Sequence, residues 1–182
     1  MKKQGTVVDG IIAALLQQGS IKHDQAQAFK KLFEQSSQSS FADFLLEEDL
    51  ISREKLLNAL SQYYKKPAFD VVGHFFEEHY VQMFPVDVMV RNQFIPLERE
   101  ENMLIVVASD PDNPELLSII GNYVSYDVRF YVGLARDIID AAREFSDYAV
   151  TEYPEMLDVD LHKEQEERNE VRNLSLEEEE QD

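Results

Sequence analysis

Residues 103–115 read Met-Leu-Ile-Val-Val-Ala-Ser-Asp-Pro-Asp-Asn-Pro-Glu and decide the fold. The stretch begins with six apolar residues in a row, which predict a strand buried on both faces. Pro111 then ends the strand because proline lacks the N–H that a sheet ladder needs. Asn113 and Pro114 are typical of a helix N-cap and first helical position, and Glu115 suits the positive end of the helix dipole. The stretch therefore predicts a buried strand followed at once by a helix.

The segments on either side predict the neighbours of this strand. Apolar residues alternate just before it, and a charged turn at residues 100–102 joins the two strands into a hairpin. The helix after the strand is expected to bury Leu116, Leu117, Ile119 and Ile120. The order strand, strand, helix, strand, helix predicts an α+β fold with a three-stranded mixed sheet covered by helices. The expected ranges are helices over 77–84 and 86–92, strands over 93–98 and 103–108, a helix over 114–122, a strand over 128–132 and a helix over 135–148.

The first third of the chain has helical periodicity throughout, with apolar residues three and four positions apart. It contains one internal repeat. Residues 15–21 read LLQQGSI and residues 45–51 read LLEEDLI, at a constant offset of 30. Each copy is a helix end, a tight turn and an isoleucine before the next helix, which predicts two degenerate helix hairpins. We therefore expect a helical repeat region over 1–66 and an α+β region over 67–148.

The charge of the chain is strongly acidic and unevenly placed. Among 182 residues, 17 basic and 36 acidic side chains give a formal net charge of −19. Such a field repels nucleic acid and anionic membrane surfaces, and favours basic partners. Residues 149–182 hold 13 of the acidic side chains and only 3 of the basic ones. They predict a mostly disordered acidic tail, with a transient helix over 161–173, because so charged a segment buries little surface.

The sequence also argues against several locations and chemistries. There is no cysteine, which excludes disulfides and thiolate chemistry. No apolar run approaches the roughly 20 residues of a membrane helix, and no signal-peptide cleavage pattern follows the first apolar segment. We expect a cytoplasmic protein without direct membrane insertion.

Several stretches together resemble a known family. Residues 45–60 follow the pattern Leu-Leu-x4-Ile-Ser-x3-Leu-x2-Ala-Leu, and residues 66–70 read Lys-Pro-Ala-Phe-Asp. Residues 94–97 read Phe-Ile-Pro-Leu, and the Ala-Ser-Asp-Pro step at 108–111 is the most specific piece. Over residues 8–148 the chain resembles the N-terminal domain of type II secretion and type IV pilus assembly ATPases.

The resemblance implies a docking function without catalysis. In that family the domain precedes the motor and contacts an inner-membrane assembly protein, and in some members it binds cyclic di-GMP. The sequence has no Gly-x4-Gly-Lys-Ser/Thr phosphate cradle, so P-loop chemistry is not expected here. We expect a free-standing, non-enzymatic binding or regulatory module without a cofactor. Its partner would be a secretion or pilus assembly protein, either the inner-membrane platform or an ATPase component, which could hold it peripherally at the inner membrane.

The alternative is a cyclic di-GMP sensor that binds the nucleotide through the helical repeats. The family motif is a tandem of Arg-Leu-Gly-x2-Leu-Leu-x2-Gly-x-Ile, and here its arginine positions are Gly10 and Ser40. No guanidinium is therefore available for guanine or phosphate, and Asp49 puts a negative charge where the second copy should have glycine. The apolar matches serve packing equally well. The positions that match, and that would line such a site, are Leu15, Leu16, Gly19, Ile21, Leu45, Leu46, Ile51, Leu56 and Leu60.

Other candidate sites have simpler interpretations. His74 and His79 are five residues apart, which fits neither helical spacing of zinc ligands, so no metal site is expected. Asp110 and Asp112 lie beside prolines and are typical of turns. Lys65 and Lys66 follow two tyrosines, and we expect a helix C-terminal cap there rather than a nucleic-acid patch. No catalytic constellation is recognisable.

Overall fold

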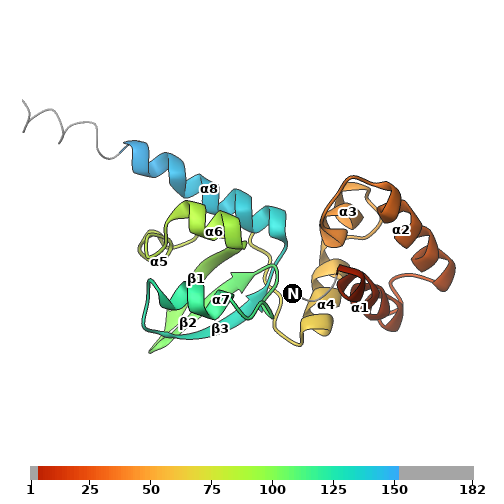
Figure 1. The fold of residues 1–182 in the computed structure, drawn as a ribbon, viewed down its shortest axis with the longest axis horizontal. Coiled ribbons are helices and arrows are strands. Elements are labelled where there is room, and N and C mark those ends of the chain that lie inside the picture. Colours follow the sequence, from red (N-terminus) through yellow and green to blue (C-terminus); the bar gives the residue numbers. More distant parts are fainter. Residues whose placement is uncertain (1–3, 152–182) are drawn as a thin grey trace, which may run out of the picture. The chain divides into compact units, whose positions relative to one another are not determined.

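The computed structural model describes residues 4–151 and confirms the α+β fold. In the described residues, six helices precede the three-stranded mixed sheet, a seventh lies between β2 and β3, and an eighth follows β3 (Figure 1). The elements below lie in the compact unit Met1–Phe145, apart from the end of α8. The division at residue 66 remains a prediction. The predicted acidic tail lies outside the described residues, except for residues 149–151, which still belong to α8.

The first four helices follow the predicted repeat. Their core contains the apolar positions of both hairpins, together with Val132 and Leu134 from the second region. Gly19 has a φ of 69° and follows the end of the first helix, as expected for a C-terminal glycine. Lys65 ends the fourth helix in the left-handed conformation with a φ of 55°, which confirms the predicted cap. The four helices are α1 (Gln4–Gln17), α2 (His23–Gln35), α3 (Phe41–Glu47) and α4 (Arg53–Tyr64).

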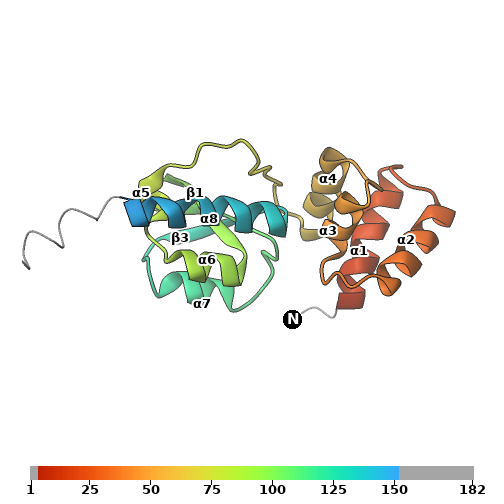
Figure 2. The same ribbon diagram turned by 90° about the horizontal axis from the view of Figure 1, so that it is seen from above.

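The sheet is built around the strand predicted from the decisive stretch. β2 (Met103–Ala108) lies between β1 (Phe94–Glu100), which is antiparallel to it, and β3 (Asp127–Val132), which is parallel. Every residue of β2 after Met103 is buried, because neighbouring strands and helices leave neither face to solvent. Figures 1 and 2 show α6 and α7 on one side of the sheet, with α8 running alongside α6. The helices of this region are α5 (Glu78–Val81), α6 (Val86–Asn92), α7 (Leu116–Gly121) and α8 (Ala135–Thr151).

The helix after β2 begins two residues later than predicted. Asn113 accepts a hydrogen bond from the Glu115 N–H at 3.1 Å, so its side chain closes a local turn ahead of α7. Leu116 and Ile120 are buried as expected, but Leu117 is 55% exposed and the prediction that it is buried was wrong. Residues four apart share one face of so short a helix, and Leu117 points about 100° away from that face.

α5 is also shorter than the predicted helix over 77–84. The chain after Val81 continues in tight turns, with the Phe84 N–H donating to the Val81 carbonyl at 3.2 Å. Phe84 precedes Pro85, and a residue before proline is biased away from helical geometry. α6 then starts after Pro85, as predicted.

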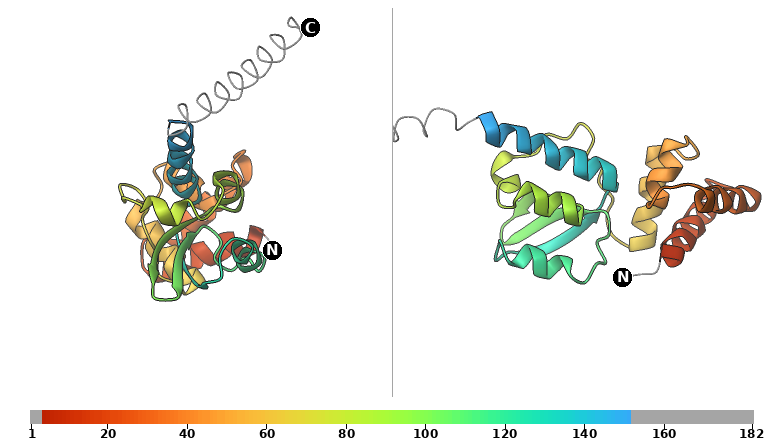
Figure 3. Two further views of the ribbon diagram at one scale, coloured as in Figure 1. Left: turned by 90° about the vertical axis from the view of Figure 1, so that its left-hand side faces the viewer. Right: turned by 45° about the horizontal axis from the view of Figure 1, so that its top comes forward.

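The segment after α4 joins the sheet, which the sequence did not predict. The Phe69 N–H donates to the Val132 carbonyl at 2.9 Å, and the Val132 N–H donates to the Pro67 carbonyl at 2.8 Å. Ala68 thereby forms a parallel bridge with Val132. These bonds fix the chain just after α4 against the end of β3 (Figure 3).

Candidate functional site

The two copies of the repeat form equivalent turns. Gly19 and Asp49 occupy equivalent positions, and both have left-handed backbones, with φ of 69° and 51°. The Ser20 N–H donates to the Leu15 carbonyl at 2.9 Å, and in the second copy Leu50 donates in the same way to Leu45 at 3.0 Å. The repeat seen in the sequence is therefore a repeat of backbone geometry, although Asp49 is not a glycine.

The positions that match the cyclic di-GMP motif lie together, and most of them form core. Leu16 and Leu46 are partly buried against this core, and Gly19 is exposed at its turn. This burial gives the matched side chains a packing role, and a role in binding a ligand remains a prediction. The buried side chains are Leu15, Ile21, Leu45, Ile51, Leu56 and Leu60.

Neither arginine position of the motif presents a guanidinium. At the first there is no space for a longer side chain, and at the second the side chain is an uncharged serine. The ring of Tyr63 lies over Gly10 so closely that a Cβ at Gly10 would be 2.0 Å from Tyr63 Cε2. α1 and α4 therefore pack together at the point where an arginine would have to project. In the second copy, the Ser40 hydroxyl accepts from the Asp43 N–H at 3.2 Å and caps α3.

A cavity of about 330 Å³ borders the start of the second copy. We call it the Asp110 cavity, because Asp110 is its one charged lining residue within the described chain. Burial raises the pKa of the Tyr64 phenol, and Asp110 adds to that effect. A site for a dianionic nucleotide needs cationic or N–H donors, and this lining supplies no cationic side chain. Its lining consists of Val7, Val8, Ile11, Ser39, Ser40, Phe41, Ala42, Leu60, Tyr64, Gln93, Ser109, Asp110, Gly133, Leu134 and Ala135.

Carboxylates also gather around α3. Burial raises the pKa of Asp43, and the nearby carboxylates Asp137 and Glu47 act in the same direction. Arg53 forms ion pairs with Asp137 and with Asp70. The pair with Asp137 connects α4 with the start of α8, and the two pairs together occupy a guanidinium that a phosphate would otherwise contact.

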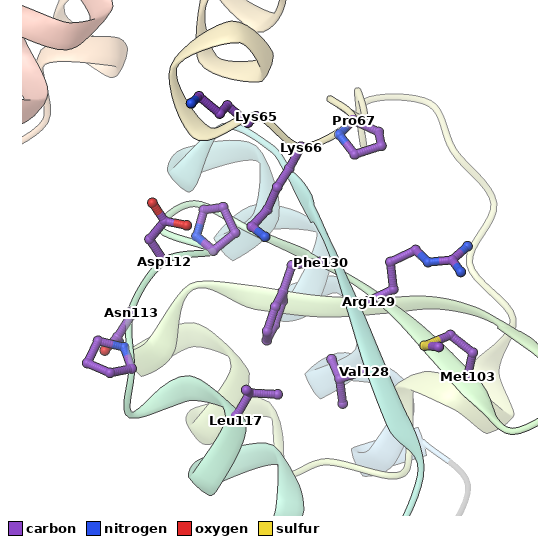
Figure 4. Close-up of a pocket in the computed structure, with 12 residues that line it drawn as sticks. Lys65, Lys66, Pro67, Met103, Asp112, Asn113, Leu117, Val128, Arg129 and Phe130 are labelled. Atoms are coloured by element: carbon purple, nitrogen blue, oxygen red, sulfur yellow. The ribbon is translucent and has the colours of Figure 1, made fainter.

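A second, larger hollow lies beside residues 128–130 of β3. This Lys66 pocket has a volume of about 570 Å³. Figure 4 shows Lys66 extending from the turn after α4 toward Phe130, with Leu117 and Val128 further along the same surface. The sequence indicates the two lysines but not the pocket, because the lining of the pocket comes from four separate segments of the chain. The lining residues are Lys65, Lys66, Pro67, Met103, Pro111, Asp112, Asn113, Pro114, Leu117, Val128, Arg129 and Phe130.

The loop between α4 and α5 carries further exposed apolar side chains that the sequence analysis did not single out. Phe75 is 91% exposed and Val72 is 59% exposed. His74 lies between Phe69 and Phe76, with ring centroids 5.0 and 4.6 Å away. Its partners are therefore aromatic rings. Among the residues that the structure describes, no group of three or more acidic or histidine side chains could hold a metal ion.

The turn interpretation of Asp110 agrees with the structure. Its carbonyl accepts a hydrogen bond from the Asn113 N–H at 3.1 Å. Across residues 4–151, no helix combines the length and the apolar character needed to cross a membrane.

The comparisons with known proteins agree with this fold. Residues 77–152 match the MshEN domain family. A structure of MshE with cdg aligns with 74% of this chain and 96% of that chain, at 18% identity and a TM-score of 0.58. A structure of the N-terminal domain of XpsE aligns with 79% of this chain and 96% of that chain, at 17% identity and a TM-score of 0.52. No curated protein sequence matches.

These findings identify the fold. The fold is that of the N-terminal domain of secretion and pilus ATPases, which confirms the resemblance found in the sequence. The sequence match to the MshEN family is confined to residues 77–152. The matched segment begins after both helix hairpins, so it contains none of the nine predicted ligand positions.

Proposed function

We propose that this chain is a non-enzymatic protein-binding and regulatory module, similar to the docking domain of type II secretion and type IV pilus assembly ATPases. The observation that carries the proposal is the MshEN match over residues 77–152, together with a fold shared across most of the chain. The partner would be a secretion or pilus assembly protein, either the inner-membrane platform or an ATPase component. The module would act in the cytoplasm, and binding to that partner would hold it at the surface of the inner membrane.

The side-chain chemistry of the described residues supports a binding role. Within residues 6–145, no charged side chain belongs to the buried set, whereas catalytic acids and bases are usually held in a water-poor cleft. The exposed Phe75 and Val72 offer apolar surface instead. The 182 residues also contain no P-loop motif.

Affinity purification tests the proposal. The tagged full-length chain is used as bait in a native lysate, and an unrelated acidic protein of similar charge serves as control. We expect a secretion or pilus assembly component to bind the chain but not the control, and to bind again when both proteins are purified. If the lysate yields no such component, and purified platform and ATPase proteins also fail to bind, the proposal is wrong.

A second candidate function is a cyclic di-GMP sensor. The structure of MshE was solved with cdg, and the two turns of the repeat have equivalent geometry here. The covered Gly10 and the anionic Asp110 cavity oppose this candidate. Titration calorimetry separates the two functions. We expect no binding heat at high micromolar cyclic di-GMP, and a saturable heat with one or two sites would establish the sensor instead.

A further inference from the structure

The floor of the Lys66 pocket is apolar and open. Leu117 is 55% exposed and shares the pocket with Val128 and Phe130 (Figure 4). Single exposed leucines are common, but this one lies in a hollow of about 570 Å³, within the range of roughly 300–1,000 Å³ typical of ligand pockets. A large apolar side chain from a partner would remove this surface from water.

The rim of the pocket is held rigidly by the backbone. The Lys65 N–H donates to the Ser61 carbonyl, and the Ser61 hydroxyl donates to the Lys66 carbonyl at 2.7 Å. The next residue, Pro67, is fixed to β3 by the Val132 N–H at 2.8 Å. The backbone of this part of the rim is therefore already ordered before a ligand binds, which lowers the entropic cost of binding.

The rim is cationic although the chain as a whole is not. In residues 4–151, neither Lys65 nor Lys66 has a side-chain ion pair. Arg129 pairs with Glu100 at 3.4 Å and extends away from Phe130 on the other side of β3 (Figure 4), so the cationic character of the rim comes from the two lysines. Asp112 is the one carboxylate among the described lining residues. The local charge of the pocket is therefore opposite to the net charge of −19.

We propose that the Lys66 pocket binds an acidic segment of a partner protein. One large apolar side chain packs on Leu117 and Val128, and flanking carboxylates meet Lys65 and Lys66. A small inorganic anion would leave the apolar floor uncovered. A long nucleic acid or an anionic bilayer would experience the whole acidic chain, whereas a short segment interacts mainly with charges within about 10 Å. The inference rests on the proposed function and names the surface that docks.

A designed peptide probe tests the pocket without knowledge of the partner. The probe has seven residues, with three acidic residues on each side of a central phenylalanine, and carries a fluorescent label for anisotropy. The first matched peptide has serine in place of phenylalanine, and the second has asparagine and glutamine in place of the acids. We expect each change to weaken binding at least about tenfold, and added salt to weaken only the acidic peptides.

Variants of the protein locate the binding. Lys66→Glu should weaken the acidic peptide at least about tenfold, whereas Lys55→Glu on α4 makes the same charge change outside the pocket and should have little effect. Leu117→Ser should weaken binding without changing its salt dependence. Equal binding by the two lysine variants, no binding by the wild type, or preferential binding to anionic phospholipid vesicles would overturn the inference.

The same variants separate this inference from the proposed function. If Lys66→Glu loses the assembly component in affinity purification while Lys55→Glu keeps it, the pocket is the docking site. Should both variants recover the component equally, the inference is wrong and the proposed function stands. If the wild type recovers none, the proposed function fails, and the peptide titration still decides what the pocket binds.

Discussion

The Asp110 cavity and the Lys66 pocket present opposite chemistry on one compact unit. The first lies beside the second copy of the repeat, where a family ligand motif would be sought, and its one described charge is a carboxylate. The second lies outside the motif and has Lys65 and Lys66 beside an apolar floor, with Asp112 as its one described carboxylate. Motif residues alone therefore do not identify the binding surface, because leucines and isoleucines at these positions also satisfy a helical core.

The largest expected effect contrasts one leucine from each region. Leu45→Ala should lower the free energy of unfolding by about 2–5 kcal/mol, because Leu45 is fully buried and the change leaves a cavity. Leu117→Ala should change it by no more than about 0.5 kcal/mol, because this leucine is 55% exposed. Urea unfolding of both variants measures the difference. Similar losses for the two variants would contradict the assignment of motif leucines to packing and of Leu117 to binding.

A somewhat smaller effect is expected from restoring the missing arginine. Gly10→Arg should destabilise the chain by about 1–3 kcal/mol, because its Cβ would overlap the Tyr63 ring. Thermal unfolding measures the loss. Adding Tyr63→Ala should recover part of it, since the two changes share one contact and are not additive. A stable Gly10→Arg variant that gains cyclic di-GMP binding would contradict the contrast between the two regions. The helical repeat would then lack only an arginine for ligand binding.

The two turns of the repeat predict effects of opposite sign. Gly19→Ala should lower the free energy of unfolding by about 1–2 kcal/mol, because alanine is strained at a φ of 69°. No atom lies within 4 Å of the added Cβ, so backbone strain is the whole of the expected effect. Asp49→Gly should stabilise by about 0.5 kcal/mol, since glycine adopts a φ of 51° without a steric cost. Chemical denaturation measures both variants. Equal and negligible effects would mean that the turns are not the equivalent structures described above.

The smallest effect concerns the carboxylates around α3. Burial raises the pKa of Asp43 above its ordinary value of 3.8, so the folded chain binds this proton more readily than the unfolded chain does. The resulting stability is present below the unfolded pKa and is lost as the pH rises through the folded pKa. Relative to Asp43→Asn, the wild type should therefore lose stability as the pH rises from about 3 to about 6.

Denaturation midpoints at several pH values check this prediction. The exposed Glu54 offers a matched control, because Glu54→Gln removes one carboxylate elsewhere in the helical region. If the wild type instead gains stability over Asp43→Asn as the pH rises, the environment of Asp43 favours its charged form, and the acidic character of that region has been overstated.

Local patterns predicted much of the fold. The apolar run in β2 and the charged turn before it were sufficient for a hairpin, because both depend on residues adjacent in the chain. The constant offset of 30 residues predicted two equivalent turns, and the structure has them at Gly19 and Asp49. Errors occurred at element ends, where one side-chain hydrogen bond, such as that from the Glu115 N–H to Asn113, shifts a helix start.

The sequence by itself determined the α+β class, the central strand, the repeat and the absence of a P-loop, since each is set by composition or by short-range periodicity. Tertiary structure decided which surfaces remain for binding. The packing of Tyr63 over Gly10 and the gathering of Lys66, Leu117 and Phe130 join residues far apart in the chain. Such contacts depend on how helices and strands pack in three dimensions, and no period along one sequence encodes that arrangement.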